Sequence, residues 1–212
     1  MCPAECSASL FSGEVATAAT CRLERVNVYS PTRARREQFA VEMSGTLGLN
    51  IVPVNEPKEA IDRADIVLAA TNTNVPVFDG AWLRDGTHVT SIVGSNVGMV
   101  QAGVIAQKRR ELDDETLTRA AVIGIASRSL AEQDEQGDVL EQVRSGLISW
   151  DKVVDLREIV GGQRAGRQNV KDITVFKNNG GQGIAELAIA DLILARAREQ
   201  KLGVEVMWGE GY

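Results

Sequence analysis

Short runs of apolar and β-branched residues alternate along this chain with segments whose apolar residues recur at helical spacing. Such runs predict strands at residues 25–30 (RVNVYS), 50–55 (NIVPVN), 65–71 (DIVLAAT), 87–94 (THVTSIVG) and 121–127 (AVIGIAS). Several of these runs are apolar at consecutive positions, as expected for strands that helices cover on both faces. The alternation therefore predicts an α/β fold with βαβ units around a mostly parallel sheet.

Helices are predicted between the strands, and they differ in how strongly the pattern marks them. The clearest one spans residues 32–47, and its apolar stripe consists of Phe39, Ala40, Met43 and Leu47. Shorter helices are predicted at 56–64 and at 112–120, and Asp113 suits the amino terminus of the latter. Residues 129–148 are highly charged, and their acidic run indicates a solvated face rather than a metal site.

The two ends of the chain lack this regular alternation of predicted strands and helices. Residues 1–21 are rich in small residues without lasting periodicity, which predicts a disordered lead-in. After residue 155 a glycine-rich connector leads to a short strand, ITVFK at 173–177, and to a long helix at 181–200. This helix is apolar on nearly all sides, so we expect it to be buried against its own domain or a partner subunit. The predicted boundaries are 1–21, 22–155 for the sheet domain, and 156–212 for part of a second domain.

Charge and composition exclude several classes of protein. The net charge is -6 and the pI is near 5.0, so no basic face for nucleic acid is expected. The sequence contains no run of 18 apolar residues, which argues against a membrane span. It has no basic residue before Arg22, which argues against a signal peptide. We therefore predict a cytoplasmic protein without a membrane partner.

Metal and histidine chemistry find little support in the sequence. The three cysteines, Cys2, Cys6 and Cys21, match no zinc-ligand spacing and are interpreted as reduced thiols. The single histidine, His88, lies in an alternating run, where a core or edge role is more common than a catalytic one. No metal site is predicted.

The turn after the strand at 25–30 carries chemistry suited to a nucleotide. It contains Ser30, Thr32 and Arg33 but no acid, whereas NAD-specific sites place Asp or Glu there to accept from the ribose 2′-hydroxyl. The two hydroxyls and the arginines at 33, 35 and 36 are donors suited to a 2′-phosphate, which favours NADP over NAD, and Arg33 is the arginine assigned to this contact. The alternative is a helix N-cap at Ser30 with Pro31 at the first helical position, followed by solvated arginines.

Two further strands end in small polar residues. The strand at 65–71 ends in Thr71 and is followed by Asn72 and Thr73, and the strand at 87–94 ends in Gly94 and is followed by Ser95 and Asn96. Because carboxyl ends of parallel strands meet at one sheet edge, these residues are candidates to line one crevice. Each group could also be an ordinary turn, since Asn and Gly are common turn residues.

Several blocks resemble those of the ornithine cyclodeaminase/mu-crystallin family. They are DIVLAATNTNVPVFDGAWLRDGTHVTSIVGSN, RRELDDETLTRA, EQGD, DLREIVGGQRAGR and ITVFKNNGGQGIAELAIADLILARA, in the family's order over about residues 23–203. The resemblance implies a Rossmann domain that binds NAD(P) beside a substrate and dimerisation domain, and hence a homodimer. It also implies hydride transfer at an imine carbon next to a carboxylate, on an amino acid or a cyclic imine.

The resemblance extends the set of candidate cofactor residues. Beside Ser30, Thr32, Arg33, Thr71 and Asn72, it implies that Val93, Gly94, Ser95 and Asn96 line the nicotinamide. It further implies that the cofactor is approached by Lys177, Asn178 and Gly180, although Lys177 could equally be a structural or an exposed side chain. No catalytic residue is assigned, because Asn96 stands where cyclodeaminases carry an aspartate and cannot act as a base.

The first Rossmann strand and its G-x-G-x-x-G turn are expected to be missing. The only glycine before residue 45 is Gly13, which cannot supply that loop alone, so the chain is interpreted as an amino-terminally truncated family member. Two function classes follow. One is an imine reductase or amino-acid dehydrogenase that prefers NADP(H), with doubtful activity in this chain; the other is a non-catalytic NADP- or ligand-binding dimer like mu-crystallin, or an inactive gene remnant.

Overall fold

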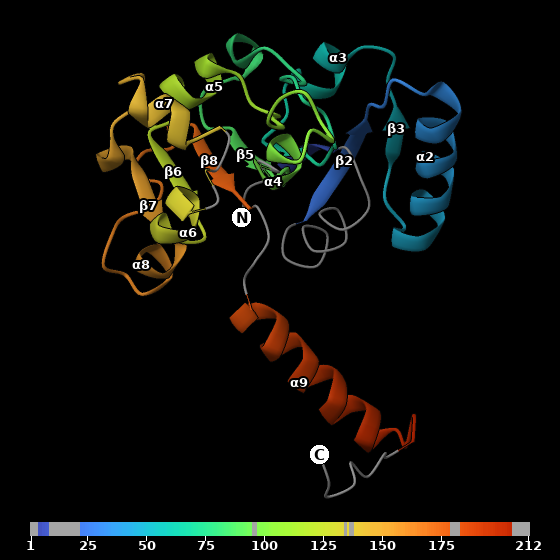
Figure 1. Cartoon of the computed structure of the whole chain (residues 1–212). Helices are drawn as coiled ribbons and strands as arrows, with labels where there is room; N and C mark the ends of the chain where they lie inside the picture. The colour runs from blue at the N-terminus through green and yellow to red at the C-terminus, as the bar shows by residue number, and fades with distance from the viewer. Residues whose placement is uncertain are drawn as a thin grey trace, which may run out of the picture. The chain divides into compact units, whose positions relative to one another are not determined.

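Figure 1 shows the fold of the chain in a computed structural model. The structure describes residues 4–8, 22–94, 97–133, 135, 138–178 and 183–204. The chain divides into two compact units, residues 1–179 and 180–212, each of which is described by itself.

A single sheet of eight strands organises the first unit, and every described strand pair is parallel. Its strands are β1 (Ala4–Ala8), β2 (Leu23–Val28), β3 (Ile51–Pro53), β4 (Ile66–Ala69), β5 (His88–Ser91), β6 (Val122–Ile125), β7 (Val153–Asp155) and β8 (Thr174–Lys177). The spatial order is β3-β2-β1-β4-β5-β8-β6-β7. The chain thus winds from β1 to one side and then returns to the other side through β4, which is the doubly wound Rossmann-like arrangement predicted from the sequence.

The predicted loss of the first strand is wrong. β1 pairs in parallel with β2 on one side and with β4 on the other, so it occupies the centre of this half of the sheet. The prediction failed because AECSA contains small and polar residues without an apolar run, and pairing on both sides compensates for this weak local signal. The expected disordered lead-in therefore contains a strand, while the segment for the glycine-rich turn, residues 9–21, lies outside the described residues.

The carboxyl-terminal part of the chain contributes two strands, β7 and β8, that differ from the prediction. β8 contains the expected ITVFK strand, but it lies between β5 and β6 in the main sheet. β7, which was not predicted, is a three-residue strand at the sheet edge beside β6. The first compact unit therefore runs through residue 179 rather than ending near 155.

Helices and short 3₁₀ turns connect the strands. They are α2 (Arg33–Leu47), α3 (Pro57–Ile61), η1 (Gly80–Trp82), α4 (Val97–Gln101), α5 (Asp114–Arg119), α6 (Arg128–Gln133), α7 (Leu140–Arg144), η2 (Trp150–Lys152), α8 (Leu156–Val160) and α9 (Gly183–Glu199). The helices predicted at 32–47, 56–64, 112–120 and 181–200 are confirmed with shorter bounds. The segment predicted as one helix at 129–148 forms two short helices instead.

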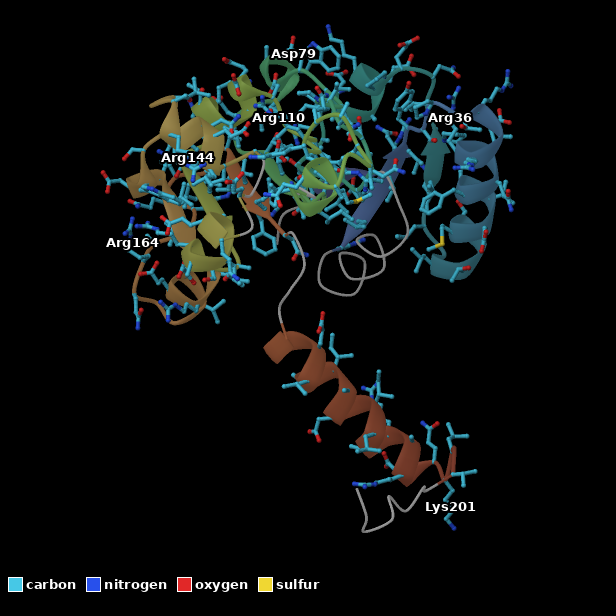
Figure 2. The ribbon with its side chains drawn as sticks, in the orientation of Figure 1. Arg36, Asp79, Arg110, Arg144, Arg164 and Lys201 are labelled. Atoms are coloured by element: carbon cyan, nitrogen blue, oxygen red, sulfur yellow. The ribbon has the colours of Figure 1, made fainter. Side chains whose placement is uncertain are left out.

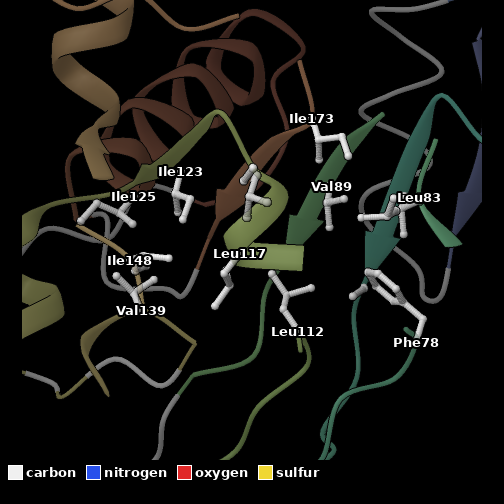
Figure 3. Packing of buried hydrophobic residues seen from close by; sticks show 14 of the residues in the cluster. Phe78, Leu83, Val89, Leu112, Leu117, Ile123, Ile125, Val139, Ile148 and Ile173 are labelled. Atoms are coloured by element: carbon white, nitrogen blue, oxygen red, sulfur yellow. The ribbon is translucent and has the colours of Figure 1, made fainter. Parts of the chain in front are cut away.

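Two apolar clusters form the core of the sheet unit. The larger one joins β4 to β8 with α5, and Figure 3 shows Leu112 and Leu117 pointing toward the strand residues Val89 and Ile123, all four of which are fully buried. The second cluster packs the predicted stripe of α2, with Phe39 and Met43, against β2 and β3. This packing fixes the carboxyl ends of β2, β4 and β5, from which the polar loops emerge.

The start of α5 is held against η1 by a close backbone approach. Asp113 caps α5, because its Oδ1 accepts from the Thr116 N–H at 2.8 Å, and its Oδ2 accepts from the Gly80 N–H at 2.9 Å. A Cβ atom on Gly80 would lie 2.3 Å from the Thr116 backbone nitrogen, so only glycine fits there. The predicted role of Asp113 at the amino terminus of this helix is confirmed.

The second unit consists of α9 in the described residues. Several of its apolar side chains are exposed, including Leu187, Ile189 and Ile193. The predicted burial of this helix, against its own domain or a partner subunit, stays a prediction. Among the helices that the structure describes, none combines the length and the hydropathy needed to cross a bilayer.

Candidate functional site

A cavity of about 850 Å³ opens at the carboxyl ends of β2 and β4. These strands flank β1, where the winding of the sheet reverses, and open α/β sheets place ligands at such a switch point. Its polar lining includes Ser30, Thr32, Arg35, Gln38, Glu42, Thr71, Asn72 and Thr73, and its apolar lining includes Phe39, Ile61 and Phe78. The volume falls within the range of about 300 to 1,000 Å³ that small-molecule and cofactor sites occupy.

A buried arginine fixes the turn that carries Ser30 and Thr32. Arg36 donates from one guanidinium nitrogen to the Ser30 carbonyl at 2.8 Å and from the other to Asn55 Oδ1 at 2.9 Å. It is only 8% exposed, and its guanidinium lies 5.9 Å from the centre of the Tyr29 ring. Figure 2 labels this side chain, which belongs to the first turn of α2. The turn is therefore anchored to the end of β3 rather than left as a free loop.

The neighbouring arginines have different surroundings. Arg33 is exposed, pairs with Glu37 at 2.7 Å, and does not line the cavity. This ion pair and the hydrogen bond within it raise the pKa of Arg33. Arg35 does line the cavity, and its side chain has no ion pair or hydrogen bond among the described residues. Of the two, Arg35 is the cation available to a ligand in the cavity.

Glu111 connects the ends of β4 and β5 from a fully buried position. Its Oε1 accepts from the Thr71 N–H and, at 2.7 Å, from the Thr71 hydroxyl. Its Oε2 accepts from the Ser91 hydroxyl at 2.6 Å and from the N–H groups of Ile92 and Val93 at 3.0 and 3.1 Å. One carboxylate thus holds the polar loop of the cavity and the loop after β5, and five donors compensate the burial of its charge.

A buried ion pair lies on the β8 side of Ser91. Lys177 Nζ is 2.8 Å from Asp138 Oδ2 and donates to Ser91 Oγ at 2.7 Å; Lys177 is 1% exposed and the Asp138 side chain 0%. Arg110, labelled in Figure 2, brings its Nε to 3.3 Å from Asp138 Oδ1. Arg110, which also pairs with Asp114, and Lys177 therefore place two cationic groups beside the buried Asp138 carboxylate.

The predicted site residues fall into three groups. Ser30, Thr32, Thr71 and Asn72 line the cavity, whereas Arg33 does not. Val93 is buried beside Glu111, Gly94 follows it, and the Asn178 N–H donates to the Ser91 carbonyl at 2.8 Å, so these three lie together at the ends of β5 and β8. The predictions for Ser95, Asn96 and Gly180 lie outside the described residues.

Two interpretations of charged residues are corrected. Lys177 is not an exposed side chain, since it is 1% exposed. Asp138, in the acidic run that was expected to be solvated, is equally buried. Sequence reasoning also missed Glu111, because RRELDD reads as a charged surface segment. The available signal was that Glu111, Asp138 and Lys177 each lie in a separate block of the family resemblance.

His88 has the structural role that the sequence favoured. Its Nδ1 lies 2.7 Å from Thr174 Oγ1 and its Nε2 lies 3.2 Å from Thr90 Oγ1. It is the first residue of β5, at the end of the strand opposite the cavity. Burial lowers its pKa to about 4, and the nearby Arg167 contributes in the same direction. Among the described residues, no group of three His, Cys, Asp or Glu side chains could hold a metal ion.

Comparison with known proteins identifies the family. The ornithine cyclodeaminase/mu-crystallin family profile matches residues 7–201. The chain belongs to this family. Curated relatives include the Delta(1)-pyrroline-2-carboxylate reductases of Bacillus cereus, 28% identical over 185 residues (87% of this chain and 53% of the relative), and of Paracoccus denitrificans, 34% identical over 178 residues (84% and 52%).

A solved structure from the family shares the fold. The Delta(1)-pyrroline-2-carboxylate reductase of Thermococcus litoralis, solved with NADH and L-proline, superposes with a TM-score of 0.80 at 30% identity. The match covers 96% of this chain and 61% of that protein. The chain spans about half the length of the curated family members that it matches. The family match begins at residue 7 and so includes part of β1.

Proposed function

We propose that this chain is an NAD(P)-dependent oxidoreductase that reduces a cyclic imine next to a carboxylate, or oxidises the corresponding amino acid. The observation that carries the proposal is the cavity at the switch point of the sheet, with hydroxyl, amide and guanidinium groups at the ends of β2 and β4. The reductases among its relatives support Delta(1)-pyrroline-2-carboxylate as the substrate to try first.

The described residues fit the adenosine half of a nicotinamide dinucleotide. Ser30, Thr32, Thr71 and Asn72 line the cavity; the two residues of the β2 turn are proposed to offer hydroxyls to the ribose, and Thr71 with Asn72 to contact the adenosine or the bridging region. Apolar side chains such as Phe39 and Ile61 offer a surface for the base. On the far side of Glu111, Val93 and Gly94 are proposed to border the nicotinamide, together with Ser95 and Asn96. When bound, the cofactor supplies the hydride for the imine carbon.

We further propose that the cofactor preferred is NADP(H), with Arg35 contacting the 2′-phosphate in place of the sequence-predicted Arg33. Arg35 lines the cavity and forms no ion pair with a carboxylate among the described residues, whereas Arg33 is paired with Glu37. The turn after β2 carries no acid that would repel a phosphate. Guanidinium groups suit this role, because they form charge-assisted hydrogen bonds with phosphate oxygens.

Substitution of the two arginines tests the cofactor preference. Loss of one charge-assisted contact in a solvated position is expected to cost about 1 to 2 kcal/mol, or about five- to thirtyfold in Kd. Arg35→Ala should therefore weaken NADPH binding by about that factor and change NADH binding by less than about twofold. Arg33→Ala is the matched control and should leave both affinities near wild type. Equal losses of NADPH and NADH affinity in Arg35→Ala would contradict the assignment.

Turnover separates the proposed enzyme from a non-catalytic binding protein. The purified chain is mixed with NADPH and Delta(1)-pyrroline-2-carboxylate, and cofactor oxidation is followed by absorbance together with proline formation. Proline produced in step with NADPH consumption supports the reductase. Saturable cofactor binding without turnover on any cyclic ketimine would favour the mu-crystallin-like alternative. A homodimer and a cytoplasmic location remain predictions for this chain.

A further inference from the structure

Ser91 lies between two buried charged groups, Lys177 and Glu111. Its hydroxyl oxygen lies 2.7 Å from Lys177 Nζ and 2.6 Å from Glu111 Oε2, and the residue is fully buried. A protonated lysine can only donate, so Ser91 accepts from Lys177 and must direct its single hydrogen at Glu111. The lysine therefore sets the direction of the hydroxyl donor that the carboxylate receives.

The two oxygens of Glu111 serve different loops. Oε1 receives both donors of Thr71, which lines the cavity. Oε2 receives Ser91 together with the N–H groups of Ile92 and Val93, on the loop after β5. A disturbance at Ser91 should consequently reach the β5 loop first and leave the Thr71 contacts largely intact.

Asp138 holds Lys177 in place at the cost of an unfavourable backbone conformation. Its φ is +62°, in the left-handed region that residues other than glycine seldom adopt, although aspartate tolerates it better than most. Its Oδ2 is 2.8 Å from Lys177 Nζ and accepts from the Glu111 N–H at 3.4 Å. A strained backbone that places a carboxylate against a buried ammonium indicates that the surroundings determine this geometry.

We propose that Lys177 and Asp138 are positioning residues that act through Ser91 and Glu111 to set the β5 loop, residues 92–94, against the nicotinamide half of the cofactor. This inference deepens the proposed function and depends on it for the identity of the ligand. Lys177 then does not contact the cofactor, because its ammonium is directed at Ser91 and Asp138 inside the protein. The direct contact that the family resemblance implied for Lys177 is replaced by an indirect role.

The first test uses Ser91→Ala, which removes one hydroxyl and leaves no buried charge unpaired. Amide hydrogen exchange is measured by NMR on the whole chain without ligand. Exchange at the Val93 amide should accelerate about tenfold or more, while the Thr71 amide stays near wild type. The Ile92 amide should accelerate less, because it also donates to the Ala69 carbonyl at 3.2 Å. Thr90→Val is the control, because it removes a hydroxyl one position earlier that bonds His88 instead. Unchanged exchange at Ile92 and Val93 in a folded Ser91→Ala chain would overturn the proposal.

The second test compares the whole dinucleotide with its adenosine half. In Ser91→Ala the Kd for NADPH should rise about tenfold, whereas the Kd for 2′,5′-ADP should change by less than about twofold. Equal losses for both ligands would overturn the specific link to the nicotinamide side. If the wild-type chain binds neither ligand, the proposed function fails, and the exchange measurement still decides whether Ser91 positions the loop.

The ion pair itself is tested by a double-mutant cycle. Lys177→Met removes the nearer cation of Asp138 and leaves Arg110 as its remaining partner, so it should accelerate exchange at Ile92 and Val93 more than Ser91→Ala does. Adding Asp138→Asn removes the carboxylate charge that has lost Lys177 and should restore part of the protection. If the effects of Lys177→Met and Asp138→Asn on amide exchange are additive, the two residues are not coupled, and the proposed pair is contradicted.

Discussion

Replacement of Glu111 by glutamine should expose how much one buried carboxylate contributes to this site. Glutamine has nearly the same shape but offers one acceptor oxygen, and its NH₂ group must face donors on the other side. If its oxygen stays with Ser91, Ile92 and Val93, its NH₂ group confronts the Thr71 N–H, which is left without an acceptor.

The magnitude follows from the number of contacts that change. Hydrogen bonds to a charged group contribute about 1.5 to 3 kcal/mol each, and a buried N–H without an acceptor costs about 1 to 3 kcal/mol. Glu111→Gln should therefore lower the free energy of unfolding by about 3 to 5 kcal/mol.

Urea unfolding followed by circular dichroism measures this loss. Glu132→Gln is the matched control, because Glu132 is exposed on α6, and it should change stability by less than about 0.5 kcal/mol. A loss of less than about 1 kcal/mol for Glu111→Gln would refute the reasoning, since it would mean that the five donors find other acceptors.

Two further changes test the packing beneath the site. The pKa of His88 in the folded chain is about 4 against an ordinary 6.5, so the unfolded state takes up the proton first as the pH falls. The stability conferred by the neutral ring is thus present above about pH 6.5 and is lost toward pH 4, by about 3 kcal/mol at most. In urea unfolding across this range, the free energy of unfolding of His88→Gln should depend less on pH than that of the wild type. An equal dependence on pH in both proteins would contradict the buried, neutral ring. Gly80→Ala should cost about 3 kcal/mol or more, because the new Cβ would lie 2.3 Å from the Thr116 nitrogen, while Gly45→Ala on α2, with nothing within 4 Å, should gain about 0.5 to 1 kcal/mol. Thermal unfolding of Gly80→Ala and Gly45→Ala tests this difference in stability, and similar melting temperatures for the two variants would contradict the steric argument at Gly80.

The sequence pattern predicted the elements of the sheet better than their arrangement. Strands such as β4 and β6 are apolar at consecutive positions, which is a local signal, and α2 has a clear apolar stripe. β1 and β7 were missed because AECSA and VVD are too short or too polar to stand out, and neighbouring strands stabilise them. The position of β8 between β5 and β6 depends on pairing across many residues, which periodicity does not encode.

In the candidate site, too, residues marked by a local signal were predicted, and residues brought together by the fold were not. Ser30, Thr32 and Thr71 were predicted because they follow strands directly, and each lines the cavity. The choice between Arg33 and Arg35 depends on the direction of neighbouring side chains of one helix, which the sequence did not reveal. Glu111, Asp138 and Lys177 were not predicted to meet, because they lie far apart in the chain and charged residues are usually exposed.

The central claim is that the cavity at the ends of β2 and β4 binds the adenosine half of a nicotinamide dinucleotide. Fluorescence titration of the purified chain with NADPH, and separately with NADH, tests it most directly. We expect saturable binding of both cofactors, tighter for NADPH, with 2′,5′-ADP competing for the same site. No saturable binding of either cofactor by a folded sample would contradict the claim.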